Sequence, residues 1–228
     1  MTSKALAAHN VSVALGGRMV FAEVSVHVAA GEVVGLTGPS GTGKTTLAQV
    51  LSGLRTPDTG QVTIDGAPLP KRGNGRIAML FQSPRRSCDP RMTLRESILE
   101  LADGRVDWDM VLESARMTSD LLERYPGQVS DGQLQRAAVA RVLASRPDYL
   151  LCDEMTSMLD PATTATVTRA VTALAESGVG VLFISHDIPL LTVSTDRIVR
   201  LAPHPSDSGS PTTSNGTVLD SHNDIGVP

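Results

Sequence analysis

The residues with the clearest chemistry form the stretch GPSGTGKTT, which begins at position 38 after an apolar run and leads into a segment with helical spacing. Its glycines let the backbone curl until successive N–H groups surround a phosphate at a helix N-terminus. The lysine is expected to reach the β- and γ-phosphates, and the first threonine to ligate Mg²⁺. The stretch therefore predicts binding of ATP or GTP, with Mg²⁺, by Gly38, Pro39, Ser40, Gly41, Thr42, Gly43, Lys44, Thr45 and Thr46.

Two neighbouring acids end the apolar run YLLCDE. Asp153 is expected to hold the Mg²⁺ ion and its water shell across from the phosphate loop. Glu154 follows it, and on an extended backbone its side chain would point the other way, where it could polarise an attacking water as general base. The alternative is that the pair is only a solvated strand end or a helix cap.

A third polar stretch, VSDGQ at 129–133, precedes a helical pattern. Ser130 with Gln133 three residues later matches a capping box, which satisfies the first free N–H groups of a helix. The same N–H groups could face a phosphate, since helix N-termini bind anions. Taken alone, the stretch favours the capping role. The carboxylate of Asp131 is unexpected at an anion site.

The surrounding pattern indicates an α/β fold. Apolar and polar residues alternate on both sides of Gly16 and Gly17, and again around DGAPL at 65–69, as in antiparallel hairpins. Unbroken apolar runs instead predict strands buried on both faces of a parallel sheet. These runs lie at 33–37, 77–81, 149–152 and 181–184.

Helical spacing follows several of these runs. It extends over 43–54, with Leu47, Val50, Leu51 and Leu54 on one face, and it recurs after Pro161. Between about 83 and 146 all the spacing is helical, which predicts a helical insert in a domain that spans 4–202. Residues 203–228 are rich in Ser, Thr, Pro, Gly and Asp, and we expect a disordered polar tail there.

Composition narrows the class of protein. The 228 residues carry a net charge of −4, which gives no general electrostatic attraction to nucleic acid or to an anionic membrane. Cys88 and Cys152 lack metal-ligand spacing, so a reducing cytoplasm fits best. The apolar runs are too short to span a bilayer and the first residues lack a signal-peptide core. Work at a membrane would therefore need another subunit as anchor.

In this order the motifs resemble the ATP-binding cassette (ABC) ATPases, and the likeness runs from Val11 to Leu201. The phosphate loop matches Walker A and LLCDE matches Walker B. LFQSP matches the Q-loop, VSDGQ the signature loop, SMLD at 157–160 the D-loop, and FISHD the switch histidine. The resemblance implies a P-loop NTPase fold of the ABC type. It has a mixed, mainly parallel sheet core, an antiparallel β subdomain and an inserted helical subdomain.

The resemblance also implies roles. Two cassettes would close head to tail, so that each ATP lies between the Walker A loop of one and the signature loop of the other, here Ser130, Gly132 and Gln133. Gln82 would ligate Mg²⁺ and sense the γ-phosphate. His186 would hold that phosphate and the attacking water, and Asp160 would bridge the two sites. Taken singly, Gln82 could be an ordinary loop glutamine and His186 a hydrogen-bonded strand end.

The stretch FQSPRRSCDPRMTLRESILE looks like the Q-loop region of cassettes that serve peptide and nickel importers. The resemblance implies an ATP-hydrolysing subunit at the cytoplasmic face of the cell membrane. Its expected partners are integral membrane permease subunits and a second cassette, identical or different, and no nucleic acid. Arg85, Arg86 and Arg91 could equally be a solvated loop or a docking surface for the permease.

Two departures from the family pattern bear on nucleotide binding. Leu15 stands where many members stack an aromatic ring on adenine, so base binding here is expected to rest on weaker apolar contact. Asp131 replaces a glycine and would repel the partner's γ-phosphate, by several kcal/mol at about 5 Å. Pairing with an arginine such as Arg136 would relieve this cost. We hypothesise that the ATP site completed by VSDGQ is the slower of two.

The sequence also leaves room for functions other than transport. A soluble ABC ATPase acting on nucleic acid or the ribosome is one, although this chain has a single phosphate loop and no heptad run or basic stripe. A switch subunit that binds ATP without turnover is another, favoured by Leu15 and Asp131 and opposed by Glu154. A small-molecule kinase would leave the signature loop and His186 unexplained.

Overall fold

The structure, a computed structural model, describes residues 4–70, 75–157, 159–204 and 219–221. Its first strands form an antiparallel sheet in the order β2-β1-β4-β5. Both predicted hairpins are present, and the central residues of each turn have positive φ: 58° and 82° at Gly16 and Gly17, 52° and 80° at Asp65 and Gly66. The strands are β1 (Ala5–Leu15), β2 (Arg18–Ala29), β4 (Thr59–Ile64) and β5 (Ala67–Pro68).

The second sheet has the order β10-β9-β3-β8-β7-β6. All its pairs are parallel except β10 with β9. The four predicted apolar runs are four of its strands, whereas β9 was not identified from the sequence. The strands are β3 (Val33–Thr37), β6 (Ile77–Leu80), β7 (Tyr149–Asp153), β8 (Gly180–Ile184), β9 (Arg197–Arg200) and β10 (Leu219–Ser221).

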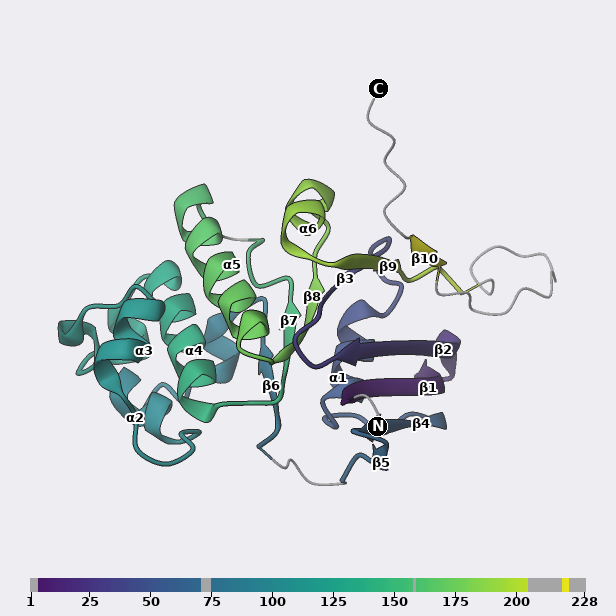
Figure 1. The fold of residues 1–228 in the computed structure, drawn as a ribbon, viewed down its shortest axis with the longest axis horizontal. Coiled ribbons are helices and arrows are strands. Elements are labelled where there is room, and N and C mark those ends of the chain that lie inside the picture. The colour runs from purple at the N-terminus through teal and green to yellow at the C-terminus, as the bar shows by residue number, and fades with distance from the viewer. Residues whose placement is uncertain (1–3, 71–74, 158, 205–218, 222–228) are drawn as a thin grey trace.

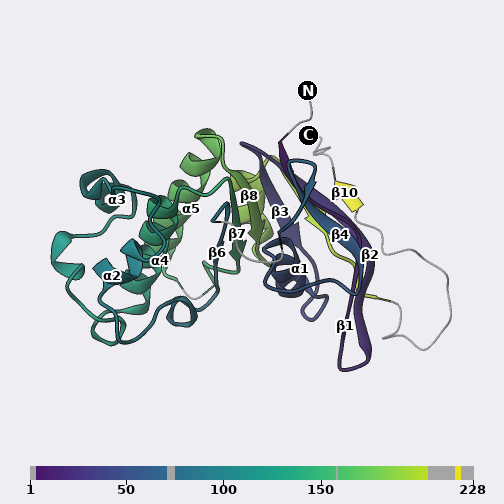
Figure 2. The ribbon, with the colours of Figure 1, turned by 90° about the horizontal axis from the view of Figure 1, so that it is seen from below.

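The central strands are apolar throughout because both of their faces are covered. In β7, Leu150 and Cys152 join the core against the helical layer, while Tyr149 and Leu151 join the core against the antiparallel sheet. Figure 2 shows the same layering, with α1 (Lys44–Leu51) between the two sheets and α4 and α5 beyond the parallel one. Because the strands from β9 to β6 run parallel, their carboxyl ends meet at one edge of the sheet, and the candidate site lies at this edge.

Helix α1 is shorter than predicted. It ends at Leu51, and Leu54, which was expected on its apolar face, is 65% exposed. Helix α5 (Pro161–Glu176) begins as predicted with proline in its first turn. Helix α6 (Ile188–Ser194) follows β8 and is capped by Asp187, whose Oδ1 accepts from the Leu190 N–H at 3.0 Å.

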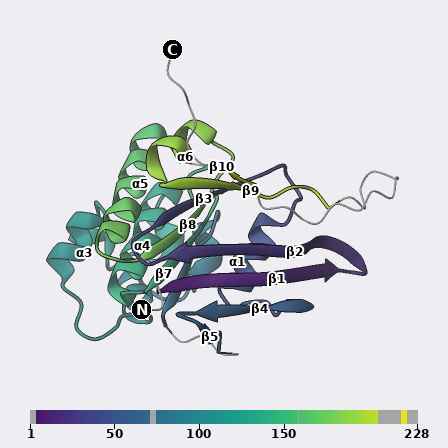
Figure 3. The same cartoon turned by 45° about the vertical axis from the view of Figure 1, so that its right-hand side comes forward.

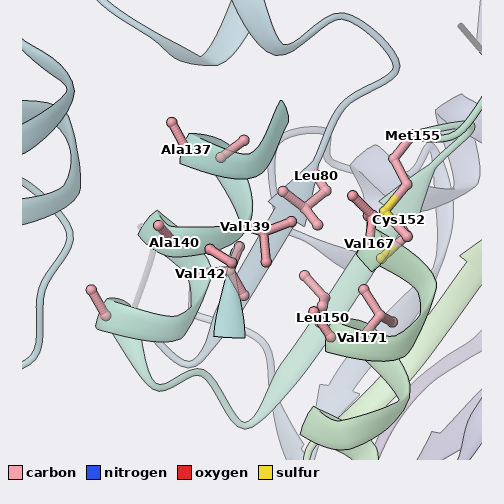
Figure 4. Close-up of a cluster of buried hydrophobic side chains, with 14 of the residues drawn as sticks. Leu80, Ala137, Val139, Ala140, Val142, Leu150, Cys152, Met155, Val167 and Val171 are labelled. Carbon is pink, nitrogen blue, oxygen red and sulfur yellow. The ribbon is translucent and has the colours of Figure 1, made fainter. Parts of the chain in front are cut away.

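The helical insert runs between β6 and β7, away from the antiparallel sheet (Figure 1). Its longest helix, α4, packs through Ala137, Val139 and Val142 against a cluster that includes residues of β6, β7 and α5 (Figure 4). SDLLERY forms only a short 3₁₀ turn. The elements are η1 (Pro84–Ser87), α2 (Leu94–Leu99), α3 (Trp108–Ser114), η2 (Ser119–Leu121), η3 (Pro126–Gln128) and α4 (Asp131–Ser145).

One short strand lies within the range of the expected tail. Leu219–Ser221 form β10, which pairs antiparallel with β9 and extends the second sheet by one strand (Figure 3). These three residues lie within the range 203–228, for which the sequence predicts a disordered polar tail. The ranges 205–218 and 222–228 lie outside the described residues. Within the described part of the chain, no helix has the length and apolar character needed to cross a membrane.

Candidate nucleotide site

The predicted phosphate loop connects the end of β3 to the start of α1. Lys44 is 5% exposed, and its Nζ donates to the carbonyl oxygens of Gly38 and Pro39, both at 2.9 Å, so it reaches back across the loop. Burial lowers the pKa of this ammonium group, and the nearby charges of Glu154 and Asp153 oppose that shift. A cation held in this way inside a curled backbone is suited to bind phosphate oxygens.

Two glycines make this loop possible. Gly38 has a φ of 150°, and a Cβ there would lie 2.4 Å from the carbonyl oxygen of Leu201. Gly43 has a φ of 92°, and its Cβ would lie 2.5 Å from Val20 Cγ1. No side chain fits at either position without displacing its neighbour, so the close packing of the loop against β2 and against Leu201, the residue after β9, depends on glycine.

Asp153, the last residue of β7, faces the loop. Its Oδ1 accepts from the Thr45 hydroxyl at 3.1 Å, and the residue is 5% exposed. Burial raises the pKa of the Asp153 carboxyl, and the Thr45 hydrogen bond opposes the shift. A metal ion bound nearby would stabilise the charged carboxylate and so offset the cost of its burial.

The oxygens of Thr45, Asp153 and Gln82 are donors that Mg²⁺ accepts, with waters and phosphate completing its shell. Among the described residues no three His, Cys, Asp or Glu side chains gather around a point that could hold a metal. The donors present therefore fit a hard ion shared with a phosphate group rather than a metal held by the protein alone.

Glu154, His186 and Gln82, three of the predicted site residues, come together beside this carboxylate. His186 Nε2 lies 2.8 Å from Glu154 Oε1, and Gln82 Nε2 donates to Glu154 Oε2 at 3.4 Å and to Ser157 Oγ at 3.3 Å. The Glu154 side chain is 22% exposed, within reach of water yet fixed by neighbours. Ser157 was singled out only as part of the D-loop match, without a contact to Gln82.

The expected reason for the direction of Glu154 is wrong. Glu154 is not extended: its φ is 48°, and its N–H donates to the carbonyl oxygen of Ile184 at 3.1 Å. The chain therefore turns immediately after β7. This turn, rather than strand alternation, separates Glu154 from Asp153, and its unusual φ for a non-glycine residue is typical of functional positions.

Two hollows border these groups. One, of about 590 Å³, is lined by Glu154, Ser157 and His186 together with residues at the start of α5. The other, of about 430 Å³, lies against Ser40, Gly41 and Thr42 of the phosphate loop and is bordered by Leu15 and His204. Leu15 is 42% exposed and thus open to a base bound beside the loop.

The signature loop caps α4 as predicted. Ser130 Oγ accepts from the Gln133 N–H at 3.2 Å, and Gln133 Oε1 accepts from the Ser130 N–H at 2.9 Å. Asp131 does not pair with Arg136, whose Nη1 donates to the carbonyl oxygen of Arg116. It pairs with Arg85, whose Nη2 lies 2.8 Å from Asp131 Oδ1.

Asp160 caps α5. Its Oδ1 accepts from the N–H groups of Ala162 and Thr163 at 3.0 Å, and its Oδ2 accepts from the Thr163 hydroxyl at 2.6 Å. These hydrogen bonds with Thr163 lower the pKa of the Asp160 carboxyl. The predicted role as a bridge to a second subunit thus falls on a residue that already orders its own helix.

Arg85 is the functional candidate whose contact the sequence left open. It is neither freely solvated nor shown to dock a permease, because it binds Asp131 within the chain. The only sequence signal for this contact is the unpaired acid at position 131, and 46 residues separate the two. Arg91 is exposed, and the side chain of Arg86 lies outside the described residues.

Comparison with known proteins decides the family. A profile of the ABC transporter family matches residues 21–157. A methionine import ATP-binding protein of Caulobacter vibrioides is 37% identical over an alignment of 206 residues that covers 82% of this chain. The chain belongs to the ABC transporter family. Other members include a putative peptide import ATP-binding protein of Brucella ovis, 35% identical over 78% of this chain, and a glutamate transport ATP-binding protein of Corynebacterium glutamicum, 33% identical over 79%.

The matches span 62% of the Brucella relative, 60% of the Caulobacter relative and 79% of the Corynebacterium relative. Among solved ABC structures, a bacterial ABC transporter cassette in dimeric form superimposes with a TM-score of 0.74 and 27% identity, covering 86% of this chain and 94% of that one. The same cassette in a dimeric post-hydrolysis state with ADP and Pi gives 0.73 and 25%, covering 87% and 96%. The ABC ATPase fold expected from the sequence is confirmed.

Proposed function

We propose that this chain is the ATP-binding and ATP-hydrolysing subunit of an ABC importer, with a peptide or nickel as the cargo. The observation that carries the proposal is the position of Glu154. Its carboxylate lies 2.8 Å from His186 and within hydrogen-bond reach of Gln82, at the same sheet edge as the phosphate loop. These neighbours fix the carboxylate in one orientation, which a base that activates water beside a phosphate requires.

Each group has a distinct task in the proposed reaction. Lys44 and the loop N–H groups bind the phosphates, and Thr45, Asp153 and the Gln82 amide oxygen would hold Mg²⁺, which would neutralise phosphate charge. Glu154 takes a proton from the attacking water, whose oxygen bonds to the γ-phosphorus as the bond to the β-phosphate oxygen breaks. His186 orients that water and the γ-phosphate. The products are ADP and inorganic phosphate.

The partner of the reaction is a second cassette. Ser130 and Asp131 are exposed at the N-terminus of α4, where another molecule can reach them. The cassette of the similar structures described above is dimeric. We propose a head-to-tail pair in which ATP is held between one Walker A loop and the opposite signature loop, at the cytoplasmic face of a membrane and bound to permease subunits.

The cargo is argued from likeness alone. Relatives are named for the import of peptides and methionine and for the transport of glutamate. The Q-loop region adds the resemblance to peptide and nickel importers. Because a cassette subunit contacts the permease and not the transported molecule, the cargo must be determined on the assembled complex.

The experiment purifies this chain with its partners from detergent-solubilised membranes by a tag and measures Mg²⁺-dependent ATP hydrolysis. We expect two permease subunits and a second cassette to co-purify. Glu154→Gln should lower the hydrolysis rate by about 10²-fold or more while ATP still binds, since it removes a general base and keeps the shape. Glu176→Gln, an exposed acid at the end of α5, is the matched control.

Three results would contradict the proposal. A Glu154→Gln complex with normal turnover would remove the assigned base. Wild-type complex that binds ATP without hydrolysing it would indicate a switch subunit instead. Co-purification with ribosomes or nucleic acid in place of membrane proteins would favour a soluble ABC ATPase.

A further inference from the structure

The N-terminus of α4 carries a carboxylate where the proposed function needs attraction for a phosphate. Asp131 is the first residue of the helix, and its side chain is 67% exposed. A helix N-terminus carries roughly half a positive charge, which an acid in the first turn neutralises. Left alone, Asp131 would give this end of the helix a net negative charge facing the partner's ATP.

Arg85 supplies the missing charge. Its Nε donates to Asp131 Oδ1 at 2.9 Å, its Nη2 lies 2.8 Å from the same oxygen, and its Nη1 donates to the carbonyl oxygen of Pro126 at 3.1 Å. Both ends of the guanidinium group are therefore held, one by the helix and one by the segment that leads into the signature loop. The 3₁₀ turn η1, which contains Arg85, packs against α4.

The charges then sum in favour of anion binding. Arg85 cancels Asp131, and the positive end of the helix dipole remains. The pair itself adds little to folding stability, because half of the Arg85 side chain and two thirds of the Asp131 side chain are exposed. Its importance grows when a second cassette closes over it, since exclusion of water strengthens every charge interaction at the interface.

We propose that Arg85 is a positioning residue that neutralises Asp131, so that this signature loop accepts the γ-phosphate of ATP held by a partner cassette. The inference rests on the proposed function. It also replaces the expectation that the site completed by VSDGQ is slow: with Arg85 in place, Asp131 behaves electrostatically like the glycine that is usual there. The repulsion is exposed only when the arginine is lost.

A double-mutant cycle on the membrane complex tests this inference. Arg85→Ala should lower the rate of ATP hydrolysis about tenfold or more, because it leaves a charge unpaired at a closing interface. Asp131→Gly alone should change the rate by less than about threefold. Adding Asp131→Gly to Arg85→Ala should restore the rate to within about threefold of wild type, because it removes the unpaired carboxylate. Arg85→Lys should retain most of the activity, because lysine keeps a positive charge beside Asp131.

Two controls separate this role from a structural one. Arg95→Ala breaks another exposed ion pair of the helical insert, Arg95 with Glu123 at 2.7 Å, and should leave the rate within about twofold. Binding of ATP to the isolated chain should be the same in Arg85→Ala and wild type, because Arg85 is held by Asp131 and Pro126 of the helical insert rather than by the Walker A loop.

Two outcomes would overturn the inference while the proposed function stands. One is an unchanged rate in Arg85→Ala. The other is a loss of rate that Asp131→Gly fails to restore, which would show that Arg85 acts through something other than this carboxylate. Absence of hydrolysis in the wild-type complex would instead overturn the proposed function, and the inference with it.

Discussion

The two halves of the proposed nucleotide site are built differently. On the sheet side, Lys44 and Asp153 are each 5% exposed and are held by backbone carbonyls and by the strand end. On the side of the helical insert, Ser130 and Asp131 are exposed, and a surface arginine holds the acid.

The two halves keep their geometry by different means. Burial and strand pairing fix the first half, so it changes only when the core changes. A solvent-exposed ion pair, Arg85 with Asp131, sets the local charge of the second half, so salt and neighbouring molecules can change that charge. This division suits a subunit whose own nucleotide contacts must be constant while its contacts with a partner must form and break.

The largest effect is expected where the core meets the Walker A loop. Gly38→Ala should destabilise the fold by about 3 to 4 kcal/mol and abolish ATP binding, because it combines backbone strain with a clash against Leu201. Gly41→Ala is the control: its φ of 82° is strained, but a Cβ there meets no heavy atom within 4 Å, so we expect about 1 kcal/mol. Urea unfolding measures both, and equal losses would contradict the assigned clash.

Two Arg–Glu pairs sharpen the comparison. Arg197 and Glu32 lie 2.6 Å apart with side chains 14% and 20% exposed, whereas Arg95 and Glu123 lie 2.7 Å apart at 38% and 67%. Glu32→Gln should cost about 2 kcal/mol because a largely buried arginine loses its counter-charge. Glu123→Gln should cost about 0.5 kcal/mol or less. Similar unfolding midpoints for both variants would show that burial does not distinguish the two regions.

The pH dependence of stability tests a hydrogen bond at the start of β7. The Tyr149 hydroxyl donates to Asp65 Oδ1 at 2.6 Å, and Asp65 also pairs with Arg76. Burial would raise the pKa of the Asp65 carboxyl, but the Tyr149 and Arg76 hydrogen bonds outweigh it, so the pKa is lowered. The resulting stability is present above the unfolded-state pKa and is lost as pH falls through the folded one.

Tyr149→Phe should therefore cost about 1.5 kcal/mol at pH 7. The difference from wild type should begin to shrink when urea unfolding is repeated below about pH 4, where Asp65 of the unfolded chain becomes protonated, and should be lost as pH falls through the lowered pKa of the folded protein. A difference that stays constant between these pH values would show that the hydroxyl stabilises the fold independently of the carboxylate.

The smallest effect is expected for binding of the adenine base of ATP. Leu15→Tyr should tighten ATP binding to the isolated chain about fivefold, because an aromatic ring at the edge of the Walker A hollow can stack on adenine. Leu54→Tyr places the same ring at another exposed leucine, one that does not border that hollow, and should have no effect. Equal affinity in wild type and Leu15→Tyr, measured by fluorescence with a labelled nucleotide, would mean that the base binds elsewhere.

Most of the fold could be predicted because its signals are local. The hairpin turns needed residues that accept positive φ, and the sequence placed glycine in both. Strand β9 was missed because its four residues, RIVR, place only two apolar residues between two arginines and make no long apolar run. Helix α1 was predicted too long since apolar spacing continued to Leu54, past the point where the chain leaves the core.

By itself, the sequence determined which groups can do chemistry: a glycine loop, a lysine and a pair of acids at a strand end, all of which depend on neighbours within a few residues. Only the tertiary structure decided how they meet. The turn at Glu154, the approach of His186, and the choice of Arg85 over Arg136 as the partner of Asp131 join segments far apart in the chain. Contacts of this kind are fixed by how helices and strands pack, and composition or spacing carries no direct record of them.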